Sequence, residues 1–167
     1  DRVAIFDRDL NYKGSLKFGN GSGPRHGVIT QDGEYLYLVT ELSNQLYVIH
    51  TGDWKVESVT CLLPNDEKQV RDTSAIHMSK DEKYVYVSTR TKNVISVLEM
   101  KDHQPTLIQC VSCLGNHPRD FMLVDQYLLC ANRNSDEIVS FPIHEDGTLG
   151  KPASKISVPE AVCLVAE

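Results

Sequence analysis

Three segments of the chain share one pattern of strand-forming residues, and this internal repeat restricts the possible folds more than any other feature. Segments 26–49, 75–98 and 120–141 align in register, with one residue deleted early in the third. Their anchor tyrosines, Tyr35, Tyr84 and Tyr127, lie 49 and 43 residues apart. A period in the forties with about four strands per unit is typical of β-propeller blades. The sequence therefore predicts an all-β propeller of four-stranded antiparallel blades.

The strand signals within each repeat are short runs of aromatic and β-branched residues bounded by turn residues. They include YLYLVT, QLYVIHT, YVYVSTR, VISVLEM, YLLCAN and EIVSFPI. No window of about twelve residues has the 3.6-residue apolar period of a helix. A β-sandwich could use similar strands, but it has no reason to repeat them in register.

Blade boundaries follow from the repeat. We predict that residues 1–22 end a partial blade, that 23–64, 72–114 and 116–158 form full blades, and that 159–167 add a closing strand. The result is an incomplete arc of somewhat under four blades, whereas propellers close with about four to eight. Open sheet edges invite pairing with another chain. We therefore expect a missing N-terminal half, or a second chain, to close the ring, and we favour the first.

Charge and hydropathy narrow the classes of partner. The formal net charge is −6, with 41% hydrophobic and 24% charged residues, which is typical of a globular protein and argues against nucleic-acid binding. No apolar run approaches the ~18 residues of a membrane span. The first residues, DRVAIFDRDL, do not resemble a signal peptide. These features favour a cytoplasmic protein with no membrane partner.

The cysteines are odd in number and lie mostly in apolar runs: Cys61, Cys110, Cys113, Cys130 and Cys163. Buried reduced thiols explain them best. Cys110 and Cys113 form a C-x-x-C pair, but a zinc or redox site would need a second ligand pair or a βαβ context. We expect no metal site and no cofactor.

The arginines gather on one face of the predicted propeller. In a four-stranded antiparallel blade, the connection into the first strand and the loop between the second and third strands lie on the same face. Arg25, Arg71 and Arg119 fall at the first kind of connection, and Arg90 and Arg133 at the second, so five of seven arginines share a face. Guanidinium groups around a central mouth would bind an anionic small molecule through its carboxylate or phosphate.

Candidate proton-transfer groups lie on the same face. His26 follows Arg25, and Glu41 occupies the repeat position of Arg90 and Arg133, six residues after the anchor tyrosine. His117 lies two residues before Arg119. Structural interpretations remain open: Arg119 and Asp120 could be a pair that fixes the start of a strand, and His77 could face the channel or the core.

The stretch GNGSGPRHG at 19–27 resembles a phosphate-binding loop only superficially. A dinucleotide fingerprint needs a helix directly after the glycines, and a P-loop needs Gly-Lys-Ser/Thr. Strand-forming residues follow instead, and GNHPRD at 115–120 repeats the phrase at the same point of a later blade. The glycines are therefore predicted to let the chain turn into an inner strand.

Several phrases resemble the lactonase family of seven-bladed propellers, which includes propeller-type 6-phosphogluconolactonases and fungal carboxymuconate cyclases. They are GSGPRH, TELSNQLYVI, AIHMSKDEKYVYVSTR, HPRDF, ANRNSDEIVSF and VPEAVC, and they occur in family order along essentially the whole chain. The resemblance implies the C-terminal half of such a protein. It also implies hydrolysis of a sugar lactone of the 6-phosphogluconolactone type.

On this interpretation, His26 or Glu41 is the general base, and Arg25 and Arg119 hold the substrate's anionic group or the developing charge. Arg90 is a ligand of second rank, and Arg133, His77 and His117 complete the expected binding set. Two alternatives remain: a carboxymuconate-type lactonizing cyclase that uses the same donors, and a non-catalytic propeller that binds a partner on the arginine-rich face. The isolated half-ring is expected to be inactive.

Overall fold

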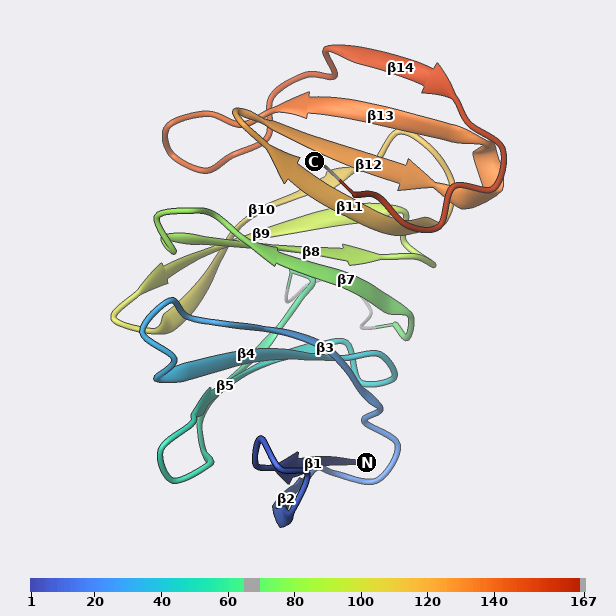
Figure 1. Ribbon diagram of the computed structural model, residues 1–167. Coiled ribbons are helices and arrows are strands. Elements are labelled where there is room, and N and C mark those ends of the chain that lie inside the picture. The colour runs from blue at the N-terminus through green and yellow to red at the C-terminus, as the bar shows by residue number, and fades with distance from the viewer. Residues whose placement is uncertain (65–69, 166–167) are drawn as a thin grey trace.

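The computed structural model describes residues 1–64 and 70–165, which form one two-stranded and three four-stranded antiparallel sheets (Figure 1). The two-stranded sheet contains β1 (Arg2–Phe6) and β2 (Tyr12–Lys17). The first four-stranded sheet contains β3 (Pro24–Ile29), β4 (Tyr35–Thr40), β5 (Gln45–His50) and β6 (Lys55–Cys61). The second contains β7 (Thr73–Met78), β8 (Tyr84–Thr89), β9 (Val94–Lys101) and β10 (Gln104–Ser112). The third contains β11 (Pro118–Val124), β12 (Tyr127–Asn132), β13 (Glu137–Pro142) and β14 (Ser154–Ser157).

Each four-stranded sheet is a meander in which neighbouring strands are consecutive in the chain. The sheets stack in chain order, and the first strand of the second sheet, β7, contacts both β3 and β11 (Figure 1). The predicted all-β arc of four-stranded antiparallel blades is confirmed. The starts of β3, β7 and β11 and the β4–β5, β8–β9 and β12–β13 connections lie at one end of the sheets, and we call this end the arginine face.

The β4–β5, β8–β9 and β12–β13 connections share one left-handed residue, nine positions after each anchor tyrosine. Asn44, Asn93 and Asp136 have φ values of 54°, 55° and 53°. Asn and Asp tolerate this conformation better than other non-glycine residues. Their carbonyls accept N–H groups from the ends of the outer strands, as in Cys113 N–H to Asn93 at 2.8 Å. These three residues therefore form the turns, and their carbonyls attach the turns to the outer strands.

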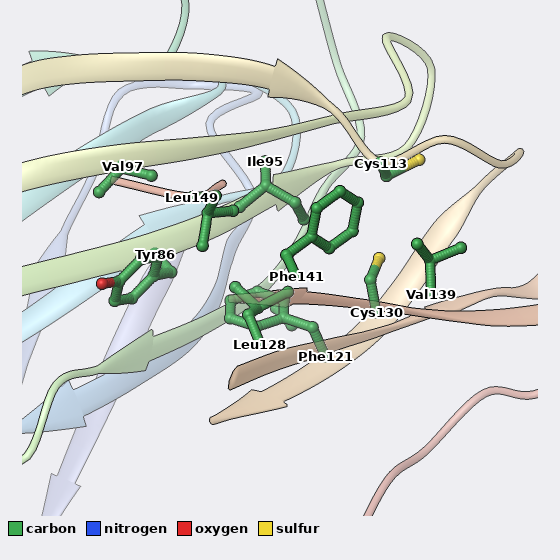
Figure 2. Packing of buried hydrophobic residues seen from close by; sticks show 11 residues of the cluster. Tyr86, Ile95, Val97, Cys113, Phe121, Leu128, Cys130, Val139, Phe141 and Leu149 are labelled. Atoms are coloured by element: carbon green, nitrogen blue, oxygen red, sulfur yellow. The ribbon is translucent and has the colours of Figure 1, made fainter. Parts of the chain in front are cut away.

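The core lies between the sheets, so the second sheet is buried on both faces. Val85 and Val87 of β8 pack toward the first sheet, whereas Tyr86 between them packs toward the third. Figure 2 shows the second interface, where Tyr86 and Ile95 meet side chains of the third sheet. Period-two alternation with apolar residues on both faces explains the nearly continuous apolar run YVYV.

The predicted closing strand at 159–167 is wrong for the described part of that range. Residues 159–165 form a turn and an irregular segment, and 166–167 lie outside the described residues. A strand needs a neighbouring strand to satisfy its backbone. Here the Leu164 N–H donates instead to the Asp120 carboxylate at 2.9 Å. The segment returns from β14 to the neighbourhood of β11 (Figure 1).

No helix among residues 1–64 and 70–165 is long and apolar enough to cross a membrane.

Candidate functional site

Each inner strand begins with a β-bulge on the arginine face. The register shifts between Pro24 and Gly27 in β3, between Thr73 and Ile76 in β7, and between Pro118 and Asp120 in β11. A bulge inserts an extra residue and re-aims the side chains around it. The bulged positions hold Arg25 and His26 in β3, Ser74 and Ala75 in β7, and Arg119 in β11. Pro24 and Pro118 suit these positions because proline fixes its own φ.

The residue before each strand start has a positive φ and binds the neighbouring turn. Gly23, Asp72 and His117 have φ values of 63°, 88° and 63°. Their carbonyls accept the N–H groups of Glu41, Arg90 and Arg133 at 2.7, 3.0 and 3.1 Å, respectively. The repeat position six residues after the anchor tyrosine is thus attached to the adjoining strand start in all three sheets.

An ion-pair network joins the first and second sheets at this face. Nη2 of Arg90 contacts Oε1 of Glu41, and Nη1 of Arg25 lies 3.7 Å from Oε2 of the same carboxylate. The Arg90 side chain is only 9% exposed, whereas that of Glu41 is 30% exposed. Arg90 is therefore a buried cation neutralised by Glu41, and Arg25 makes the looser contact.

The bulges are also linked to one another across the sheets. Nε of Arg25 donates to the Ser74 carbonyl at 3.1 Å, and the Ser74 hydroxyl donates to the Arg119 carbonyl at 2.5 Å. Arg25, Ser74 and Arg119 occupy the same position in successive sheets. The side chains of Arg25 and Ser74 each bond the main chain at this position of the following sheet. One edge of the Arg25 guanidinium thus has a structural role. Burial lowers the pKa of Arg25 from its ordinary value, although Glu41 opposes this effect.

The Arg119 guanidinium differs from those of Arg25 and Arg90. Among the described residues it has no hydrogen bond or ion pair. It nevertheless lies close enough to Arg25 and His26 to lower the pKa of both by its charge, after the larger effect of burial. Arg119 is therefore the site cation best placed to receive an external anion.

His26 is exposed and lies among charged groups of the arginine face. Partial removal from water, followed by the charge of Arg25, lowers its pKa below the usual 6.5. Arg119 and His77 act in the same direction, and Asp120 opposes them. The imidazole is therefore neutral at pH 7, with a ring nitrogen able to accept a proton.

His77 of β7 and Asp120 of β11 lie next to each other on neighbouring inner strands. Nε2 of His77 lies 4.0 Å from Oδ1 of Asp120, and the ring meets Phe121 edge to face with centroids 4.9 Å apart. Burial alone would raise the Asp120 pKa. The nearby His77 ring, the bond from the Leu164 N–H and the neighbouring Phe121 N–H outweigh burial and lower the pKa of Asp120. The His77 side chain is 41% exposed, so it is not enclosed in the core.

His117 and Arg133 extend the site toward the third sheet. The His117 N–H donates to the Asn93 side chain at 2.7 Å, which fixes the backbone before β11. Burial, followed by the charges of Arg90 and Arg133, lowers the His117 pKa. Arg133 itself is 45% exposed and lies 3.8 Å from Glu160. Arg133 is the most peripheral of the predicted binding residues.

The structure thus joins Arg25, Glu41 and Arg90 by direct contact and places the other predicted residues around them. His26, His77 and Arg119 lie near Asp120, whereas His117 and Arg133 lie toward the third sheet. Sequence reasoning missed Asp72, which lies 3.5 Å from Arg90 through Oδ1. Its alignment with Gly23 was the available signal, because glycine marks positions of positive φ.

The fold and this face together define part of a β-propeller whose bulged inner strands present charged side chains on the arginine face. The family described as "Lactonase, 7-bladed beta-propeller" matches residues 1–166. The chain belongs to this lactonase family of seven-bladed propellers.

Individual relatives agree with this assignment. A 6-phosphogluconolactonase from Bacillus subtilis is 33% identical over 167 residues, covering 95% of this chain and 48% of the relative. The solved structure of a Lactobacillus plantarum protein matches with a TM-score of 0.86 at 30% identity, covering 97% of this chain and 50% of the other. The periplasmic gluconolactonase PpgL from Pseudomonas aeruginosa matches with a TM-score of 0.81 at 28% identity, covering 87% and 43%. The chain spans about half the length of the curated relatives it matches.

Proposed function

We propose that this chain supplies the arginine-rich half of a site that hydrolyses a sugar lactone of the 6-phosphogluconolactone type. The observation that supports this proposal is the meeting of Arg25, His26 and Arg119 at the bulged strand starts. Names of relatives point the same way, since the B. subtilis relative is a 6-phosphogluconolactonase and the P. aeruginosa neighbour a gluconolactonase.

Arg119 is proposed to bind the anionic group of the substrate, because its guanidinium is unpaired among the described residues. Arg25 contributes the N–H donors that neither bond Ser74 nor face Glu41. Planar guanidinium groups bind phosphate and carboxylate through paired N–H donors. In the alternative orientation of the substrate, these donors face the lactone carbonyl oxygen instead and stabilise the negative charge that develops on it.

His26 is proposed as the general base. Its lowered pKa keeps the imidazole neutral at pH 7, so that it can remove a proton from the attacking water. The water oxygen forms a bond to the carbonyl carbon, and the bond from that carbon to the ring oxygen breaks. The ring oxygen leaves as a hydroxyl after protonation, and the product is a hydroxy acid. Glu41 is the second candidate base, but Arg90 and Arg25 already contact its two oxygens.

The test is an assay of 6-phosphogluconolactone hydrolysis against the spontaneous rate. It uses the 167-residue chain and a seven-bladed protein that contains it. His26→Ala is expected to lower kcat of the seven-bladed protein by about 10²–10⁴-fold, the usual contribution of a general base. His144→Ala is the matched control, because His144 lies in the β13–β14 connection, away from the arginine face. No acceleration by the seven-bladed protein, or full activity in a His26→Ala, Glu41→Ala double variant, would contradict the proposal.

The same donors serve the alternative activity of a carboxymuconate-type cyclase, because guanidinium groups bind carboxylate and phosphate alike. The substrate panel therefore includes a muconate-type carboxylate beside the phosphorylated lactone. Turnover of the carboxylate alone would assign the cyclase activity. Binding of a protein partner without turnover of either substrate would assign a non-catalytic propeller.

We also propose the cytoplasm as the location. The P. aeruginosa neighbour is named as periplasmic, so the family is not restricted to one compartment by name. Fractionation of cells that express the seven-bladed protein tests this proposal, and recovery in a periplasmic or extracellular fraction would overturn it.

A further inference from the structure

Asp72 contacts both members of the buried ion pair, and it does so mainly through its backbone. Its N–H donates to the Glu41 carbonyl at 2.7 Å. Its carbonyl accepts the Arg90 N–H at 3.0 Å and the Arg90 Nε–H at 3.1 Å. Three backbone-mediated bonds therefore converge on one residue between the two charged side chains.

These bonds depend on an unusual backbone conformation. Asp72 has a φ of 88°, a region that side chains rarely adopt and that is disfavoured outside glycine, asparagine and aspartate. The aligned residues Gly23 and His117 also have positive φ, and their carbonyls bind the aligned turns in the same way. The conformation is therefore a property of the strand start rather than of the aspartate alone.

The Asp72 carboxylate contributes less than the backbone does. Oδ1 lies 3.5 Å from Nη2 of Arg90, at the outer limit of a hydrogen bond, and the side chain is 38% exposed. By contrast, the bond from Arg90 Nε to the Asp72 carbonyl fixes the plane of a guanidinium that is 9% exposed. With that plane fixed, Arg90 binds Oε1 of Glu41 through Nη2, and Oε2 faces Arg25.

We infer that Asp72 is a positioning residue. Its left-handed backbone orients Arg90, and through Arg90 it directs Oε2 of Glu41 toward Arg25. The inference concerns the geometry of this chain, and its catalytic consequence rests on the proposed lactonase function.

The test compares Asp72→Gly, Asp72→Asn and Asp72→Ala. Glycine keeps the positive φ without a side chain, asparagine keeps it without the charge, and alanine disfavours it. The variants Asp125→Gly and Asp125→Ala control for the general cost of alanine at such a position, because Asp125 has a φ of 51° in the β11–β12 turn.

The first measurement is the exchange protection of the Arg90 Nε–H in ¹⁵N-resolved NMR spectra of the 167-residue chain. Protection is expected in the wild type and in the glycine and asparagine variants, and a loss of about five- to thirty-fold in the alanine variant. The Asp125 variants should retain wild-type protection at Arg90. Equal loss in Asp72→Gly and Asp72→Ala, or no protection in the wild type, would overturn the inference.

The second measurement is lactone hydrolysis by the seven-bladed protein. Asp72→Ala is expected to lower kcat about five- to thirty-fold, with KM nearly unchanged, while Asp72→Gly and Asp72→Asn stay within about twofold. If the NMR result holds and no variant, including the wild type, hydrolyses a lactone, the proposed function fails and the positioning role stands. If the wild type is active and all three variants lose kcat equally, the backbone role is refuted.

Discussion

The Tyr37 hydroxyl and Nδ1 of His103 are 2.7 Å apart across the boundary between the first and second sheets. The His103 ring also stacks on Tyr35, with centroids 3.7 Å apart. At the next boundary Tyr86, which aligns with Tyr37, donates to the Gly147 carbonyl at 2.9 Å. At each of these two boundaries between four-stranded sheets, a tyrosine hydroxyl therefore contacts the connection between the third and fourth strands of the following sheet. These connections, β9–β10 and β13–β14, lie on the side opposite the arginine face.

Removing either partner of the Tyr37–His103 contact is expected to destabilise the chain. Burial raises the pKa of Tyr37 to about 12, so its hydroxyl stays protonated and available as a donor. Tyr37→Phe should lower the free energy of unfolding by about 1 kcal/mol. His103→Ala should lower it by about 1–3 kcal/mol, because this variant leaves the buried Tyr37 hydroxyl without a partner. Urea unfolding of both single variants and the double variant gives their coupling energy. Purely additive effects would show that the contact contributes nothing.

Gly147 and Gly33 offer a matched pair, because both have a φ of 78°. A Cβ added at Gly147 would lie 2.3 Å from Cδ1 of Tyr84, whereas one added at Gly33 would meet nothing within 4 Å. Gly33→Ala should lower the free energy of unfolding by about 1–2 kcal/mol, the cost of a positive φ for a residue with a Cβ. Gly147→Ala should cost about 1–3 kcal/mol more, the usual range for overpacking. Equal losses in thermal or urea unfolding would contradict the tight packing of the β13–β14 connection on Tyr84.

Glu41→Gln should destabilise the chain by leaving Arg90 with a weaker partner. A buried charge that loses its partner costs about 3–5 kcal/mol. Because Glu41 is 30% exposed and a glutamine still accepts a hydrogen bond, we expect about 1–3 kcal/mol. Glu160→Gln is the control, since its 3.8 Å pair with Arg133 is exposed and should be worth less than about 1 kcal/mol. If Glu160→Gln lowered the free energy of unfolding as much as Glu41→Gln, the result would contradict the buried character of the network.

His26 should make stability fall as the pH drops below about 6.5. Its folded-state pKa is lowered by burial and by Arg25, whereas the unfolded chain keeps the ordinary value of 6.5. Between the two values the unfolded state binds more protons, so acidification favours unfolding. The effect is absent above pH 6.5 and levels off below the folded-state pKa. Urea unfolding from pH 8 to pH 5 gives the free energy of unfolding of the wild type and of His26→Gln. The dependence of this free energy on pH should differ between the two proteins only below about pH 6.5. Parallel profiles would refute the shift.

The blade pattern could be predicted because the alternation of buried residues can be recognised in the sequence of each strand. Val85, Tyr86 and Val87 show that alternation directly, as both faces of the second sheet are buried. The segment 159–165 has similar apolar residues and was predicted as a strand, but a strand also needs a partner. The availability of a partner is a tertiary property that local composition does not contain.

The candidate site was predictable where it depended on side-chain type and loop position. Arg25, Glu41 and Arg90 were chosen on that basis, and they lie in one ion-pair network. Asp72 was missed because its bonds are made by backbone atoms, and backbone conformation leaves little trace in a single sequence. The bulges were missed for the same reason, since an extra residue in one strand changes no residue type.

The strand starts have a consequence for how such a site can change. Gly23, Asp72 and His117 are three different residues that share one sign of φ, and main-chain atoms make the bonds that attach the neighbouring turns. Replacing the side chain at Asp72 or His117 leaves that scaffold intact, provided that the new residue tolerates a positive φ. At Gly23 a Cβ would lie 2.8 Å from Cγ of Leu42, so a side chain there also requires Leu42 to move. Selection could therefore alter the groups at the mouth one blade at a time by single substitutions, without rebuilding a loop.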